Sequence, residues 1–151
     1  MGRPMEITML QGGEAKLQKL PYNVHLVTIE QARESLPEAK QLLIELQVMN
    51  DQAQDLTHEI EILLEELDPE NEHVVEIADT LALIIRTWQT IVSKLELTGA
   101  KVASLDPGRL EWHGVVDGNL ALYSWCMGEE DIEWYHYLDS TYLSRKPLIE
   151  A

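Results

Sequence analysis

Two apolar repeats lie back to back in the middle of this 151-residue chain, and they constrain its fold more than any other feature. In each repeat the apolar residues recur at alternating steps of four and three, which keeps one apolar seam along one side of a helix. The first repeat comprises Leu42, Leu46, Met49, Ala53, Leu56, Ile60, Leu63 and Leu67, and the second comprises Val74, Ile77, Leu81, Ile84, Trp88, Ile91, Leu95 and Thr98. Only Asp68-Pro69-Glu70-Asn71 separates them, so the chain must reverse there. The pattern predicts a long antiparallel helical hairpin, similar to a coiled coil, with helices over 36–67 and 70–98.

Two helix-capping signals precede the first repeat. Thr28 with Gln31, and Ser35 with Glu38, both have the spacing of a capping box, in which a side chain at each end satisfies a free backbone N–H. Pro37 lacks an N–H and biases the preceding residue away from helical geometry. We therefore expect a short helix from Thr28, a corner at Pro37, and then the first long helix.

The region before Thr28 differs from the rest of the chain. Residues 1–26 show no periodicity and contain Gly12-Gly13 and Pro21, which predicts a flexible leader. The remainder, 27–151, is long enough for a single domain with its own core. We expect a helical hairpin region at 28–99 and a β-meander with a tail at 100–151.

The C-terminal third changes to short runs that are typical of strands. Residues 109–116 alternate, Asp117-Gly118 is a strong hairpin turn, and 119–127 form a second run. A third run over 132–138 follows Gly128. The prediction is a small three-stranded antiparallel β-meander, and the fold class is mainly α (α+β).

The second long helix carries an additional apolar stripe beside its seam. Its members are Val75, Ala78, Ala82, Ile85 and Val92, with Gln89 as an interruption. One two-helix seam cannot cover both stripes, and an uncovered stripe is costly in water. The C-terminal region, the short helix or a second copy of the chain is expected to cover it, so a homodimer through this helix is possible.

The charge and composition exclude several classes of partner. Against 27 acidic residues the chain has 11 lysines and arginines, a net charge of −16, which repels nucleic-acid backbones and anionic membranes. No run approaches the roughly 20 apolar residues of a membrane helix. Cys126 is the only cysteine, so no intrachain disulfide is possible, and the N-terminus lacks the apolar core of a signal peptide. We expect a soluble, cytoplasmic protein.

Polar and aromatic side chains gather in the C-terminal third, where the candidate binding residues are Trp125, Glu129, Trp134, His136 and Arg145. In a strand, Trp134 and His136 share one face. His136 is either a proton carrier or ligand, or a packed ring bonded to the backbone or Asp139; we favour the packed ring. Arg145 either clamps the tail to Glu129 or Asp139, or offers its planar fork to an anion; we favour the clamp.

Signals of catalysis or metal binding are weak throughout. The five histidines never take a zinc-type spacing, and Cys126 has no cysteine partner. The run Glu129-Glu130-Asp131 lacks the fixed offsets and the glycine of a calcium loop. We predict no catalytic residue, no metal site and no cofactor.

Motifs at both ends of the folded region resemble those of one family. Residues 28–33, Thr-Ile-Glu-Gln-Ala-Arg, with Leu36-Pro37 resemble the "T-L-E-E-A-R…L-P" start of domain-of-unknown-function family 2203, which occurs in bacteria and archaea and has plant relatives. Residues 125–129 resemble its "C-W-R-L-G-E", residues 134–136 its "W-W-H", and residues 145–148 its "G-R-x-P-L". The resemblance spans about 28–148 and implies no established activity.

The chain departs from this family at four places. Ser124 stands where the family usually has cysteine, Cys126 where it has arginine, and Ser144 where it has glycine. Residues 111–113, Glu-Trp-His, replace "D-F-P". These departures count against chemistry that depends on the family's cysteine.

Two functions remain open from the sequence. The first is a non-catalytic protein-interaction or scaffold module, in which the hairpin is a rigid arm and the protein partner is unknown. The alternative is a small-molecule or metal-dependent activity centred on Trp134, His136, Glu129 and Arg145. An exposed His136 in a polar pocket favours the second, and a buried His136 bonded to the backbone favours the first.

Overall fold

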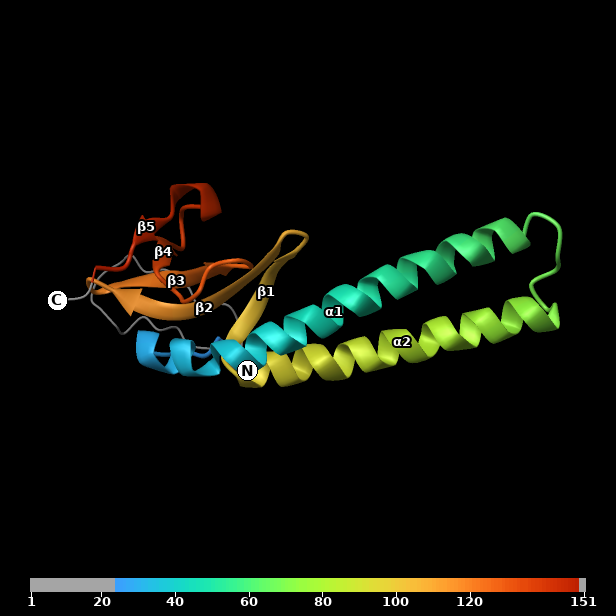
Figure 1. Ribbon diagram of the computed structural model, residues 1–151, viewed down its shortest axis with the longest axis horizontal. Coiled ribbons are helices and arrows are strands. Elements are labelled where there is room, and N and C mark those ends of the chain that lie inside the picture. The colour runs from blue at the N-terminus through green and yellow to red at the C-terminus, as the bar shows by residue number, and fades with distance from the viewer. Residues whose placement is uncertain (1–23, 150–151) are drawn as a thin grey trace, which may run out of the picture.

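Two long helices and a small antiparallel sheet make up the part of the chain that the computed structural model describes, residues 24–149 (Figure 1). The helices are α1 (Ile29–Leu63) and α2 (Glu72–Leu97). They are followed by β1 (Ala100–Leu105), β2 (Gly108–Val116), β3 (Asn119–Cys126), β4 (Trp134–Tyr137), the 3-10 turn η3 (Tyr142–Ser144) and β5 (Lys146–Pro147). The predicted helical hairpin is confirmed. The leader predicted over 1–26 falls almost entirely outside the described residues.

Local capping signals set the helix ends. The Thr28 hydroxyl accepts a hydrogen bond from the Gln31 N–H at 3.0 Å, and the Gln31 side chain accepts one from the Thr28 N–H at 2.9 Å, which completes the predicted capping box. α2 begins after Asn71, whose side chain accepts from the His73 N–H. After α2, Gly99 has a φ of +94°, the left-handed conformation that glycine adopts without steric cost.

The predicted corner at Pro37 is wrong, because α1 continues through this residue. A proline in a helix interior removes one backbone hydrogen bond and crowds the preceding turn. Here Leu36 and Ala39, which flank it, are buried against the sheet, and this packing offsets the local cost. Ser35 therefore caps no second helix: its hydroxyl donates to the Ala32 carbonyl and accepts from the Trp112 indole N–H. The first turns of α1, blue in Figure 1, run at an angle to the rest of the helix.

The sheet has five strands in the order β1-β2-β3-β4-β5, and every neighbouring pair is antiparallel. The predicted hairpin turn lies between β2 and β3, with φ values of 52° at Asp117 and 79° at Gly118. The prediction of three strands is wrong because it omits both edges. β1 is bulged between Val102 and Ser104, and β5 has only two residues, so neither has the regular alternation that reveals a strand.

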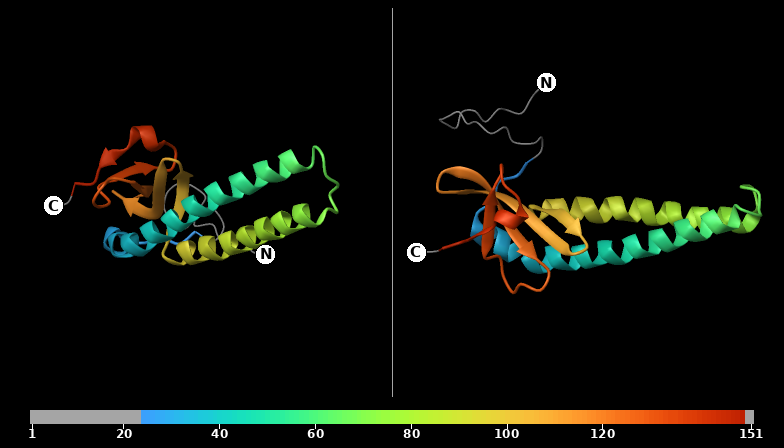
Figure 2. Two further views of the ribbon diagram at one scale, coloured as in Figure 1. Left: turned by 45° about the vertical axis from the view of Figure 1, so that its right-hand side comes forward. Right: turned by 90° about the horizontal axis from the view of Figure 1, so that it is seen from above.

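The sheet packs one face against the first half of α1, close to where α2 ends (Figure 2). The core joins both parts of the chain, since the side chains of α1 and the sheet bury one another. Its fully buried members include Leu43 and Leu46 from α1, Leu95 from α2, and Leu110, Trp112 and Trp125 from the sheet. Polar bonds tie the same surfaces together: the Gln47 side chain donates to the Leu105 carbonyl at 2.8 Å.

The far half of the hairpin extends beyond the sheet, and apart from Val74 and Ile77 of α2 its side chains are half-buried or exposed (Figure 1). Within α1, no residue after Leu46 is fully buried, and the seam residues Leu56 and Leu81 are only half-buried. Of the additional stripe on α2, Val92 packs against the core, whereas Val75 and Ile85 are 41% and 51% exposed. The described part of the chain therefore covers this stripe only at its base.

Candidate functional site

The alternation of the strands gives the sheet two chemically different faces. Leu110 and Trp112 of β2 are fully buried toward the helices, so Arg109, Glu111 and His113 of the same strand point to the opposite, outer face. Across the ladder, outer-face positions continue through Cys126, Ser124 and Leu122 on β3 and through Trp134 and His136 on β4. The outer face therefore gathers most of the polar and titratable groups of the sheet.

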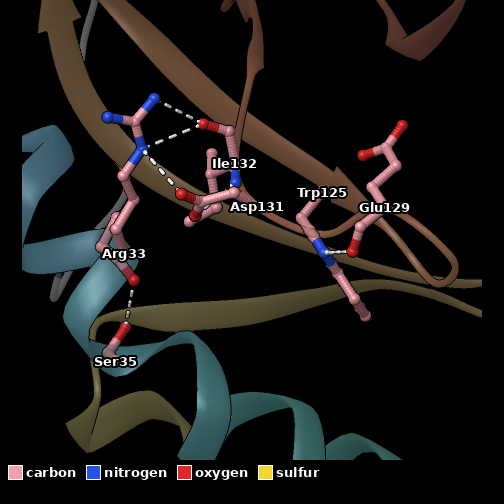
Figure 3. A network of polar contacts seen from close by, with 7 residues as sticks. Arg33, Ser35, Trp125, Glu129, Asp131 and Ile132 are labelled. Atoms are coloured by element: carbon pink, nitrogen blue, oxygen red, sulfur yellow. Dashed lines mark hydrogen bonds and ion pairs between the residues drawn. The ribbon is translucent and has the colours of Figure 1, made fainter.

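Trp125 does not lie on this outer face with the other candidates. It pairs with Leu110, is fully buried, and has the Lys40 ammonium of α1 5.7 Å from its ring centroid. Its indole N–H donates to the Glu129 carbonyl at 2.9 Å (Figure 3). Trp125 is thus a core residue that fixes the turn carrying Glu129.

The same figure shows how the next turn is attached to α1 (Figure 3). The Arg33 guanidinium donates twice to the Ile132 carbonyl, at 3.1 and 2.8 Å, and lies 3.7 Å from the Asp131 carboxylate. The turn over residues 128–133 is therefore bonded to Trp125 of β3 near its start and to Arg33 of α1 near its end, and these bonds fix the position of Glu129.

Arg145 and Glu129 form a two-pronged ion pair. The two guanidinium nitrogens lie 3.3 and 2.9 Å from the two carboxylate oxygens, and one of these oxygens also accepts from the Cys126 N–H. The side chains are 13% and 25% exposed, so water screens the pair only partly. Of the two clamps predicted for Arg145, the structure contains the one with Glu129. Arg145 thereby fastens the tail to the sheet.

Aromatic rings and a second arginine surround this ion pair. The Arg145 guanidinium lies 4.1 Å from the ring centroid of Tyr142 and 5.1 Å from that of Trp134. The Arg109 guanidinium stacks on Tyr142 at 3.6 Å. Hydrogen bonding to the Cys126 side chain, with burial, raises the pKa of Tyr142, so its phenol is neutral. These contacts hold η3 against the outer face.

His136 is buried and bonded on both sides. Its Nδ1 lies 2.9 Å from the Tyr137 carbonyl, and its Nε2 lies 3.2 Å from the Glu111 carboxylate. Both ring nitrogens are therefore engaged by neighbouring oxygens. Lys101 lies 3.8 Å from the other oxygen of Glu111. The predicted packed ring is present, with Glu111 in the place proposed for Asp139.

His113 also lies on the outer face of β2, two residues after Glu111, and is buried. Burial lowers its pKa most, the neighbouring Lys101 lowers it further, and Glu111 partly opposes both. The neutral imidazole is therefore favoured in the folded chain.

Several of these partners were missed in the sequence. Arg109, Glu111 and His113 alternate along β2, and that alternation alone predicts that they share a face. Their partners come from other strands and from η3, which no local pattern reveals. Within residues 24–149, no three His, Cys, Asp or Glu side chains gather as a metal-binding group.

Loss of the Arg145 ion pair is expected to destabilise the fold. Arg145→Ala removes two bonds to a partly buried carboxylate and should lower the free energy of unfolding by about 1 to 3 kcal/mol in urea titrations. Arg86→Ala, an exposed arginine on α2, is the control and should change it by less than about 0.5 kcal/mol. Equal stability of wild type and Arg145→Ala would show that the ion pair contributes nothing to attaching the tail.

Comparisons with known proteins agree with the motifs at the two ends of the fold. A family model described as an uncharacterized conserved protein (DUF2203) matches residues 25–148. No curated protein matches the chain, and no solved structure does. None of the helices within the described residues is long and apolar enough to cross a membrane.

Proposed function

The chain belongs to the uncharacterised family DUF2203, and from this premise we propose that it is a non-catalytic protein-interaction module whose helical hairpin is the binding arm. The observation that carries the proposal is the open apolar stripe of α2, on a hairpin that extends beyond the sheet (Figure 1). Exposed apolar surface of this kind is typical of sites that another protein covers.

The contacts on the outer face of the sheet support the same proposal. A ligand-binding or catalytic role for Arg145 requires that its guanidinium can contact a ligand, but both of its terminal nitrogens bond to the Glu129 carboxylate. A role for His136 requires access to its ring, but the ring is 4% exposed and bonded at both nitrogens. These contacts favour a structural role for both residues over a small-molecule or metal-dependent activity.

The sheet acts in this proposal as the base that holds the arm. α1 spans both parts, since its first half packs on the sheet and its second half pairs with α2. A helix anchored in this way presents its far half in a fixed direction, which lowers the entropy cost of binding. The coiled-coil pairing predicted from the heptads is part of this proposal, because a heptad seam keeps the apolar side of each helix facing the other along the arm.

Affinity capture with paired variants tests this function. Ile85 and Leu83 are 51% and 55% exposed and, being two residues apart, lie on opposite sides of α2. We expect the 151-residue chain and its Leu83→Glu variant to retain one stoichiometric protein from extracts of the native host. The Ile85→Glu variant should lose it while keeping its helix content by circular dichroism.

Two results would contradict the proposal. Retention of the same partner by Ile85→Glu would move the interaction away from the stripe. The absence of any stoichiometric partner would remove the interaction role itself. If the homodimer predicted through α2 forms, the same samples will reveal it, because the immobilised wild type will retain a second copy of the chain.

A further inference from the structure

The hairpin carries a groove that begins between its helices on the side of the open stripe and continues along α1. One hollow of about 290 Å³ is lined by Asn50, Ala53, Ile84, Ile85 and Trp88. A second, of about 240 Å³, is lined by Ala53, Gln54, Thr57, His58 and Glu61. Both hollows are lined by Ala53, whose small side chain leaves room between its larger neighbours. Together they extend along α1 from Asn50 to Glu61, about 17 Å at 1.5 Å per residue, which is roughly three helical turns.

The lining of this groove matches one face of an amphipathic helix. Ile84, Ile85 and Trp88 provide an apolar wall, and Asn50, Gln54 and Thr57 provide hydrogen-bonding groups on the other side. Beyond the hollows the stripe continues through Ala82, Ala78 and Val75, all exposed. The two alanines allow a partner backbone to approach α2 closely. Recognition of a helix in a groove uses apolar anchors spaced by three and four residues, as this stripe is.

The charge of the arm identifies the kind of partner. Residues 48–90 contain eleven acidic residues and one arginine, a net charge of −10 out of −16 for the whole chain. A second copy would bring another arm of charge −10 against the first, and like charges at close range oppose association. A helix rich in lysine or arginine is instead attracted to the acidic arm that carries the groove, whose lining includes Glu61. The groove therefore favours a basic partner over self-association.

We propose that this groove of the hairpin binds a basic amphipathic helix of another protein, with its apolar face on Ile85 and Trp88 and its cations toward Glu61 and the other acidic side chains of the arm. This inference rests on the proposed interaction role and adds the chemistry of the partner to it. The acidic residues raise the association rate and select against acidic helices, and the apolar wall holds the bound helix.

Fluorescence anisotropy with defined peptides tests the partner chemistry. The probe is a labelled synthetic leucine–lysine peptide of about 18 residues, long enough to cover the groove as a helix. One control peptide has the same composition in a scrambled order without an apolar face, and the other has glutamate in place of lysine. We expect the amphipathic basic peptide to bind at least about tenfold more tightly than either control.

Matched variants locate the binding site. Ile85→Ser should weaken binding of the basic peptide by about tenfold or more, because it removes an apolar anchor. Leu83→Ser removes an equally exposed apolar side chain from the opposite side of α2 and should leave binding within about twofold. Raising the salt from about 0.05 to 0.3 M should weaken binding by about tenfold, since it screens the negative charge of the arm.

Several outcomes would overturn the inference. Equal binding of the scrambled peptide would mean that charge alone attracts it, and an equal loss in Leu83→Ser would place it elsewhere. A dimer seen by sedimentation velocity in wild type and lost in Ile85→Ser would mean that a second copy occupies the groove. If affinity capture finds a partner that depends on Ile85 but is not basic, the interaction role stands and this inference fails. If capture finds no partner, both fail.

Discussion

Trp112→Ala is expected to destabilise the fold by about 3 to 5 kcal/mol, the range for removing a large aromatic ring from a packed core. Trp112 is fully buried at the junction of sheet and helix, and its indole N–H donates to the Ser35 hydroxyl at 2.9 Å. The substitution leaves a cavity between β2 and α1 and removes the bond that joins them. Urea denaturation followed by circular dichroism measures the loss.

Trp112→Phe separates the two contributions. It keeps most of the apolar volume but removes the N–H, so its cost should be clearly smaller than that of alanine. Leu83→Ala, at a side chain that is 55% exposed, is the control and should change stability by less than about 0.5 kcal/mol. A loss in Trp112→Ala no larger than in this control would mean that Trp112 does not join the sheet to α1.

Leucine-to-alanine substitutions along the seam of α1 are expected to decrease in effect with distance from the sheet. Leu46 is fully buried in the shared core, and Leu46→Ala should cost about 2 to 5 kcal/mol. Leu56 belongs to the same apolar repeat but is only half-buried between the two helices, so Leu56→Ala should cost about 1 to 2 kcal/mol. The repeat by itself predicts equal effects at the two positions.

The midpoint of chemical unfolding for each variant, with the slope held in common, tests this difference. Equal losses at Leu46 and Leu56 would indicate that something covers the far half of the hairpin in solution. Measurements over a range of protein concentrations distinguish self-association from an intrinsic property of the chain, because only self-association depends on concentration.

On the outer face of the sheet, the sequence predicts which side chains of one strand lie together, and the tertiary structure determines which strands meet. Alternation in a strand correctly placed Trp134 and His136 on one face, because side chains in strands alternate by geometry alone. The same rule separates Trp125 from the strand-borne residues of that face, once the register of β3 against β2 is known. Glu111 of β2 contacts His136 of β4 across the intervening strand β3, and only strand pairing brings them together.

The sequence by itself determined the features that depend on neighbours along the chain. The Thr28–Gln31 capping box and the Asp117-Gly118 turn act over a few residues, and the structure contains both as predicted, together with the predicted helical hairpin. Tertiary packing decided the rest. Burial of Leu36 and Ala39 keeps α1 helical through Pro37, and pairing with β2 and β4 makes strands of the irregular edges β1 and β5. Contact with the sheet also buries Leu46 fully while Leu56 stays half-buried, because a local repeat specifies which side of a helix is apolar but not what covers it.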